Sequence, residues 1–200
     1  MSAVLGAALA TTSVSASAQL GGLLKGGDSA KSSITADQIV QRYVGGARSV
    51  GNANTTMLEA VGLKDEASAN AAQAANLTEG ATKDTLEESV KVQTANSKAL
   101  EAKLADSSTK LDAAGKKKFA VSVNELAKGV VHYAALGKEA SGFKPGLGSL
   151  GGSANSALFV AKSLPTSTKN LVQTLKVAIE YCKSNNIPVD KSATDATALI

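Results

Sequence analysis

Apolar side chains recur every three or four residues along most of the chain, and no segment shows the strict alternation of a strand. This spacing places the apolar groups on one face of an α-helix. The clearest case is the segment 112–141, whose apolar face is formed by Phe119, Val123, Leu126, Val130, Tyr133 and Leu136. The pattern therefore predicts an all-α protein.

Polar and breaking residues set the ends of the first predicted helix. Thr35 and Gln38 fit a capping box, in which the threonine hydroxyl caps a helical amide and the glutamine reaches back. Apolar residues continue from Ile39 to Val61, and Gly62 is a suitable stop. Gly45, Gly46 and Gly51 weaken this helix and predict a bend or a close approach of a neighbour.

Five further helical segments are expected. Residues 65–78 form one, and Gly80 breaks the chain after it. From Thr82 an apolar seam with heptad spacing begins, but two of its six positions, Gln93 and Ser97, are polar, which favours a bundle helix over a coiled coil. Residues 112–141 follow. Residues 153–163 form a short helix that ends near Leu164, and Pro165 opens the last helix, which runs to about residue 183.

These elements predict a bundle of about five helices, mostly antiparallel, with flexible tails at both ends. The expected organisation is a signal peptide over residues 1–18, a flexible leader over 19–33, the bundle over 34–186 and a polar tail over 187–200. The segment 143–152 (FKPGLGSLGG) reads as a loop.

Composition supports closely packed helices. Alanine, the strongest helix former, occurs 36 times, whereas aromatic residues number six and proline three. The net charge of +4 is uneven, because residues 59–88 carry a local charge of −5 and residues 103–144 a local charge of +4. We expect the acidic segment to compensate Lys116, Lys117 and Lys118, whose position at a helix start is unfavourable to the helix dipole. Two arginines in the whole chain argue against nucleic-acid binding.

The first residues have the features of an export signal. Residues 3–14 are uncharged and mostly apolar, and Ala16-Ser17-Ala18 fits a signal-peptidase site before Gln19. The apolar stretch lacks the positive residues that usually precede it, and it is too short to span a membrane. A periplasmic or secreted location of a bacterial protein is the expectation, with an alanine-rich tail of a cytosolic protein as the alternative reading. No stable membrane anchor is expected.

Candidate chemistry is sparse. Residues 146–151 match G-x-G-x-x-G, but the segment before them reads as helix and no acid lies between Glu139 and Glu180, so a dinucleotide site is not expected. His132 is the only histidine and lies within an apolar helical run, where a packed or surface role is favoured over a metal ligand or a triad member. Cys182 is the only cysteine and is expected to be a buried apolar group, with an intermolecular disulfide as the alternative.

Carboxylates do not form an obvious site either. The adjacent pairs Asp65/Glu66 and Glu87/Glu88 do not share a helix face. We therefore predict no enzyme, and no catalytic, cofactor-binding or metal-binding residue. The favoured function is a structural or interaction role through a protein partner, with the oligomeric state open. The alternative is a carrier that holds a small apolar ligand between helices, gated by the loop 143–152.

Overall fold

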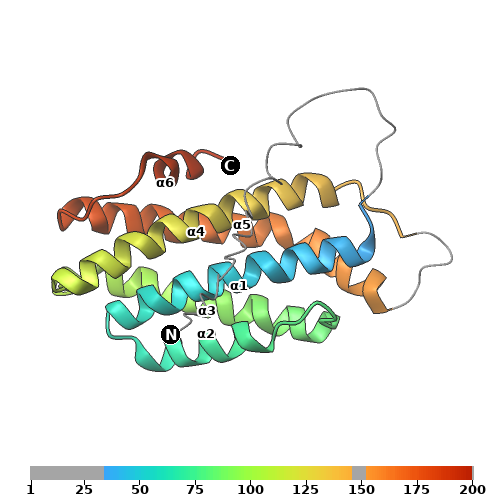
Figure 1. Cartoon of the computed structure of the whole chain (residues 1–200), viewed down its shortest axis with the longest axis horizontal. Helices are drawn as coiled ribbons and strands as arrows, with labels where there is room; N and C mark the ends of the chain where they lie inside the picture. Colours follow the sequence, from blue (N-terminus) through green and yellow to red (C-terminus); the bar gives the residue numbers. More distant parts are fainter. Residues whose placement is uncertain (1–33, 146–151, 200) are drawn as a thin grey trace, which may run out of the picture. The chain divides into compact units, whose positions relative to one another are not determined.

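The computed structural model describes residues 34–145 and 152–199. Within these residues the chain forms six helices and no strand: α1 (Ala36–Ala60), α2 (Lys64–Asn76), α3 (Lys83–Ala105), α4 (Ala113–Ala140), α5 (Gly152–Ser184) and α6 (Lys191–Ala196) (Figure 1). The predicted all-α bundle is confirmed. The expectations for residues 1–33, which include the export signal, lie outside the described residues, as does the 146–151 part of the loop.

Local sequence accounts for where the helices begin and end. The capping box at α1 is present in both directions: the Gln38 amide donates to Thr35 Oγ1 at 3.2 Å, and the Thr35 amide donates to Gln38 Oε1 at 3.0 Å. Gly62 follows α1 with a φ of +86°, a conformation that glycine adopts without strain. Thr82 caps α3 and Asp112 caps α4 in the same side-chain-to-amide manner.

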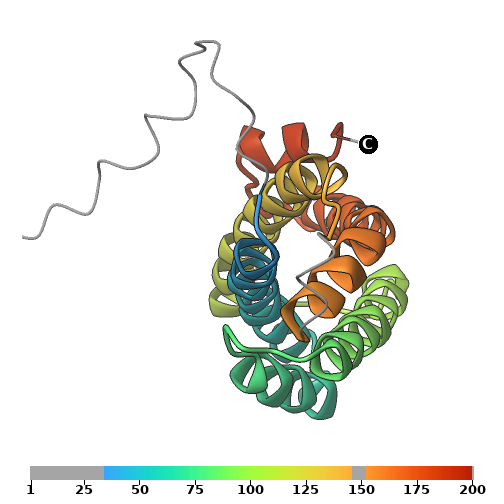
Figure 2. The ribbon, with the colours of Figure 1, turned by 90° about the vertical axis from the view of Figure 1, so that its right-hand side faces the viewer.

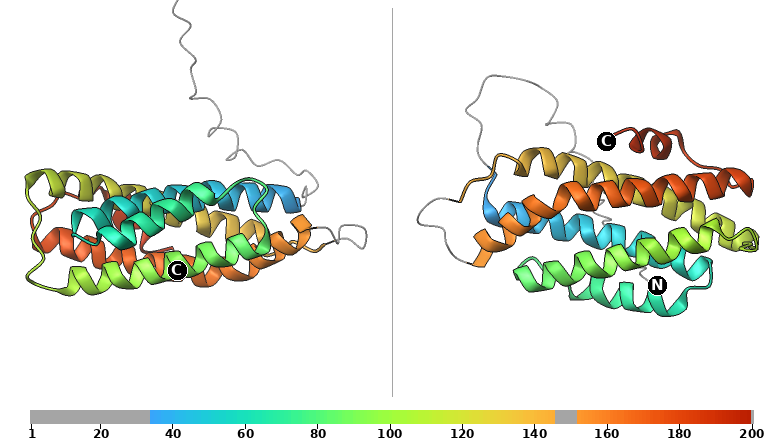
Figure 3. Two further views of the ribbon diagram at one scale, coloured as in Figure 1. Left: turned by 90° about the horizontal axis from the view of Figure 1, so that it is seen from below. Right: turned by 180° about the vertical axis from the view of Figure 1, so that it is seen from behind.

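Consecutive helices are antiparallel, so α1, α3 and α5 run in one direction and α2, α4 and α6 in the other (Figure 1 and Figure 3). α1 packs against α4, α5, α3 and α2, and α5 also packs against α3 and α4. α2 lies against α1 and α3 on one side of the bundle, and α6 lies against α4 and α5 on the opposite side (Figure 2). α1 is therefore in contact with every other long helix.

The core consists of the faces that helical spacing predicts. All six apolar residues predicted for the buried face of α4, from Phe119 to Leu136, are fully buried. On α3 the seam residues Leu86, Leu100 and Leu104 are buried as well. Alanine fills many of the remaining core positions, which lets the helices approach one another closely.

Two expectations need correction. α5 does not end at Leu164: it continues through Pro165 as one helix of 33 residues. The reason is tertiary packing, because buried residues continue on both sides of the proline, with Val160 and Leu164 before it and Thr168 and Leu171 after it. Continuous burial of one face outweighs the local cost of the missing amide.

The segment after α5 is more ordered than a polar tail. α5 ends at Ser184, close to the predicted residue 183. Asn186 follows at a φ of +53°, and the chain then turns back along the bundle. Ile187, Ala193 and Ala196 are buried, and α6 packs against α4 and α5. Asn124 of α4 fixes the turn, because its amide donates to Asp190 Oδ2 at 2.8 Å. The small apolar residues within this polar stretch provide the contact.

Candidate functional site

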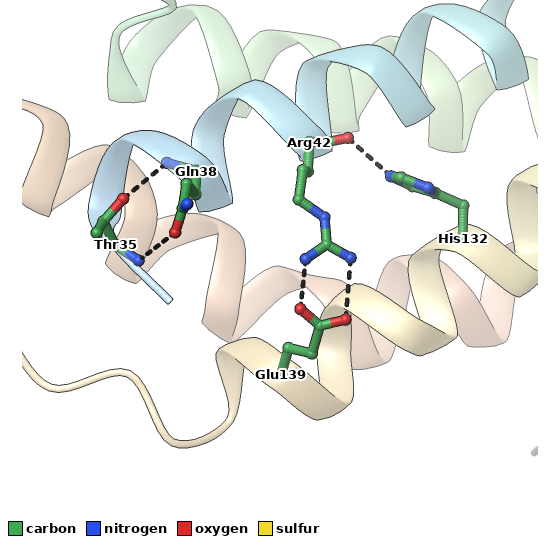
Figure 4. A network of polar contacts seen from close by, with 5 residues as sticks. All are labelled: Thr35, Gln38, Arg42, His132 and Glu139. Carbon is green, nitrogen blue, oxygen red and sulfur yellow. Dashed lines mark hydrogen bonds and ion pairs between the residues drawn. The ribbon is translucent and has the colours of Figure 1, made fainter. Parts of the chain in front are cut away.

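The face shared by α1 and α4 carries the principal polar contacts between these helices, together with an open groove. Near the start of α1, Arg42 reaches Glu139 of α4 through two hydrogen bonds (Figure 4). The Nη2–Oε1 distance is 2.9 Å, and Nη1 bonds Oε2. The hydrogen bond from Arg42 lowers the pKa of Glu139, and the same bond raises the pKa of Arg42.

His132 joins the same contact from one side. Its Nε2 lies 2.8 Å from the main-chain oxygen of Arg42 (Figure 4). A carbonyl oxygen only accepts, so Nε2 carries the proton and donates it. The half-buried ring is thus a structural clasp between α4 and α1, in agreement with the packed or surface role that the sequence favours.

Glycines bring the two helices close together beside this clasp. A Cβ at Gly46 of α1 would lie 2.5 Å from His132 Cδ2 and 3.0 Å from Tyr133 Cε1, and a Cβ at Gly129 of α4 would overlap the Val50 side chain. The predicted close approach is thus confirmed for Gly46, whereas Gly45 faces open space.

Two buried tyrosines face each other at this interface. The rings of Tyr43 and Tyr133 have centroids 5.3 Å apart and are tilted by 32°. Burial raises the pKa of Tyr43 to about 12 and that of Tyr133 well above its usual value. Both phenols therefore stay protonated, and their rings contribute apolar contact to the core.

Further along the same face the side chains no longer fill the space between the helices. An open groove of about 470 Å³ lies there. Its α1 wall has small side chains and its α4 wall has longer ones: it is lined by Ser49, Asn52, Ala53, Thr56, Lys117, Lys118, Val121, Ser122 and Glu125. Val121 is 60% exposed, the largest exposure among the large apolar residues that the structure describes.

The groove has a positive charge. Glu125 is paired with Lys128 at 2.7 Å, so its carboxylate is already compensated. Within residues 34–145 and 152–199, no ion pair involves Lys117 or Lys118. Their neighbour Lys116 has a partner that the sequence did not predict: its Nζ donates to the main-chain oxygen of Asn185 at 2.7 Å, just after α5. The end of a helix dipole, and not the acidic segment 59–88, compensates this lysine.

The other candidates do not form a second site. Cys182 is fully buried, as expected, and burial raises the pKa of its thiol to about 12. The carboxylates of Asp65 and Glu66 lie in the first turn of α2, where they complement the helix dipole. Glu87 pairs with Lys83 at 2.8 Å and Glu88 with Lys91 at 3.9 Å along α3. The described residues hold no group of three side chains suited to bind a metal ion.

A recess of about 450 Å³ lies where α1, α3 and α5 begin, beside the described end of the loop 143–152. Its lining includes Asp37, Val40, Glu79, Gly80, Ala81, Thr82, Lys83, Asp84, Gly152, Ser153, Asn155 and Ser156. Asp37 and Asp84 occupy the first turns of two of these helices and complement their dipoles. Eight of these twelve residues are polar or charged, whereas ligand pockets for apolar molecules are lined mainly by apolar residues.

The groove was not predicted from the sequence. Val121 was the available signal, because it interrupts the polar face of a helix whose buried residues, such as Phe119 and Val123, follow another stripe. The small residues opposite it on α1 carry no such signal, since serine, asparagine and alanine are ordinary on an exposed helix face.

Comparison of the chain with protein-family models, with curated proteins and with solved structures finds no match. Among the helices that the structure describes, none is both long enough and apolar enough to cross a lipid bilayer.

Proposed function

We propose that this chain is a non-enzymatic protein that acts through surface contacts, and that the α1–α4 groove receives an acidic, partly apolar segment of a partner protein. The observation that carries the proposal is the exposure of Val121, one helical turn after Lys117 and Lys118, in a groove with room for side chains. A valine at this exposure in a concave surface favours an apolar contact. The two lysines favour carboxylates beside it.

The contrast along the same face supports this assignment. In one half, Arg42, His132 and Glu139 bridge the two helices and satisfy one another. In the other half, the lysines at the groove have no carboxylate partner among the described residues, and Glu125 is neutralised by Lys128. The open half therefore has space and uncompensated positive charge for a partner, whereas in the bridged half the charges of Arg42 and Glu139 compensate each other.

The experiment is a titration of the ¹⁵N-labelled full chain with a short peptide of alternating glutamate and leucine. We expect saturable shifts of amide signals at Ser49, Asn52 and Val121. The double change Lys117→Glu/Lys118→Glu should weaken binding at least about tenfold, as expected for loss of two charge contacts. A matched double change on α5, Lys169→Glu/Lys176→Glu, alters the net charge equally and should leave the affinity nearly unchanged.

The apolar part is tested separately. Val121→Ser should weaken the same peptide by about fivefold, since roughly 1 kcal/mol of apolar contact is lost. Val131→Ser is the control, because Val131 is 48% exposed on the same helix but does not line the groove. Equal weakening by both control and groove variants, or shifts at lysines all over the surface, would mean that the peptide is held by unspecific attraction.

We further propose that the mature protein is exported, as the pattern of residues 3–18 indicates. Mass spectrometry of the protein isolated from its native compartment should then find Gln19 as the first residue. An intact Met1 in that sample would contradict both the processing and the periplasmic or secreted location.

A further inference from the structure

A small, partly open void lies between α1, α2 and α3, and its walls are unusually polar for an alanine-rich bundle. Its volume is about 10 Å³. It is lined by Ala47, Gly51, Asn70, Gln73, Ala74, Leu77, Ser89 and Gln93. None of these side chains is charged, and half of them have an amide or a hydroxyl group.

Asn70 of α2 is the centre of the polar contacts around the void. Its side-chain nitrogen donates to the Gly51 main-chain oxygen at 2.5 Å and to Thr55 Oγ1 at 2.9 Å. Its side-chain oxygen accepts a hydrogen bond from Asn96 of α3 at 3.0 Å. Both protons of the amide are therefore used, whereas the oxygen can still accept one more hydrogen bond.

Gln93 of α3 provides the complementary group. Its side-chain nitrogen is buried and has no hydrogen-bond partner among residues 34–145 and 152–199, although the side chain lines the void. A buried N–H without a partner is unfavourable, and ordered water is the usual partner where protein groups do not suffice. Ser89, one turn earlier on α3 and 5% exposed, adds a hydroxyl that can donate or accept.

We propose that this void is a binding site for a single water molecule that completes the contact of α2 with α3. The water accepts one of the two free protons of Gln93 Nε2 and donates to the free lone pair of Asn70 Oδ1 and to Ser89 Oγ. The site meets both requirements for an ordered water: it has room for about one water molecule, and it offers two to four polar partners. An ion does not fit this chemistry, because the lining is neutral, and an organic ligand does not fit the volume.

The experiment detects the water directly in the full chain. Cross-relaxation between water and the side-chain amide of Gln93 should give NOE and ROE signals of opposite sign, which indicates a bound water and not proton exchange. The Gln93 amide should also exchange with solvent at least about tenfold more slowly than that of Gln41, which is exposed on α1. A crystal structure of the protein should show one ordered water within about 2.7–3.2 Å of Gln93 Nε2.

Two variants separate the site from burial in general. Gln93→Leu removes the donor and should abolish the ordered water. The water should then be absent from a crystal structure of the variant, and the NOE signals between water and the Asn70 side-chain amide should disappear. Ser97→Ala removes a buried hydroxyl that also lacks a protein partner, one turn further along α3 and outside the void, and should leave the signal intact. Gln93→Met serves the same purpose if the leucine variant does not fold.

The proposal is overturned if the wild-type protein shows no water contact at Gln93, because the void is then dry. It is also overturned if the water persists unchanged in Gln93→Leu, or if the Gln93 amide exchanges as fast as that of Gln41. Loss of the signal in Ser97→Ala as strongly as in Gln93→Leu would mean that the contact reports general loosening of α3 and not this site.

Discussion

α1 makes two interfaces of opposite character. Against α4 it presents Tyr43 and Val50, and glycines on both helices allow side chains of one to reach the backbone of the other. Against α2 the contact depends on Asn70, which bonds the Gly51 oxygen and Thr55 of α1. The centre of the first interface is apolar and sterically tight, with its polar contacts and the groove at the exposed edge, whereas the second is polar and directional.

The difference shows what each interface contributes. α4 buries large side chains, which account for most of the stabilisation that a small core can provide. α2 buries Ala67, Asn70 and Ala74 along its length, so it removes little apolar surface from water. Its contact depends instead on the hydrogen bonds of Asn70, and we expect these bonds to fix the register of α2 more than they add to stability.

The largest effect is expected from Gly129→Val in α4. A Cβ at this position already overlaps Val50, so the branched side chain would force the helices apart. We expect a loss of about 3 kcal/mol in the free energy of unfolding, at the upper end for overpacked cores. Urea denaturation followed by circular dichroism measures it.

Gly45→Val is the matched control for this change. Gly45 is also inside a helix, but nothing lies within 4 Å of a Cβ placed there. The variant should be as stable as the parent or slightly more stable, because valine has the higher helix propensity. Similar losses in both variants would show that a branched side chain is unfavourable anywhere in these helices, and that the contact of α1 with α4 does not determine the result.

An intermediate effect is expected from Asn70→Leu in α2. The change removes the partner of Asn96 and leaves Thr55 with one hydrogen bond fewer. We expect a loss of about 2 kcal/mol, within the range for a buried polar group that loses its partner. Asn76→Leu, at the exposed end of α2, should change the stability by less than about 0.5 kcal/mol.

Hydrogen exchange distinguishes the two interfaces in the Asn70→Leu variant. The amides of α2 should exchange faster than in the parent protein, while those of α4 remain protected, because α2 is held by few apolar contacts and can open separately. Equal acceleration in α2 and α4 would show that the polar contact supports the whole bundle and not α2 alone.

The apolar interface was predictable from the sequence, and the polar one was not. Regular spacing identified the buried face of α4 from Phe119 to Leu136, because each large apolar side chain must be removed from water. Gly46 was recognised as a possible close contact, since glycine in a helix costs stability unless it is needed. Asn70 carried no signal, because an asparagine in an alanine-rich helix is exposed more often than buried.

The errors at Pro165 and after residue 186 have a common cause. A proline predicts a helix end and a polar composition predicts a loose tail, and both predictions use local residues only. The structure depends instead on contacts with helices that are distant in the sequence. α5 continues through Pro165 because both of its halves pack on the same core, and α6 forms because Ala193 and Ala196 find a surface on α4 and α5. The groove at Val121 was missed for the same reason, since it exists only where two helices lie side by side.

The smallest effect is expected at the ion pair between Arg42 and Glu139, which lies at the exposed edge of the interface between α1 and α4. Their side chains are 38% and 42% exposed, so solvent screens the pair, and Glu139→Gln should lower the stability by only about 0.5 kcal/mol at neutral pH.

The sign of the pH dependence follows from the lowered pKa of Glu139 in the folded protein. The stabilisation is present above the usual carboxyl pKa and disappears as the pH falls through the lowered one. The stabilities of the parent and the variant should therefore differ at pH 7 and converge as the pH falls through the lowered pKa of Glu139. Glu180→Gln, on the exposed surface of α5 and outside the ion pairs of the described residues, should show no such convergence. A difference between parent and Glu139→Gln that is constant from pH 7 to pH 3 would assign the effect to packing of the side chain and not to its charge.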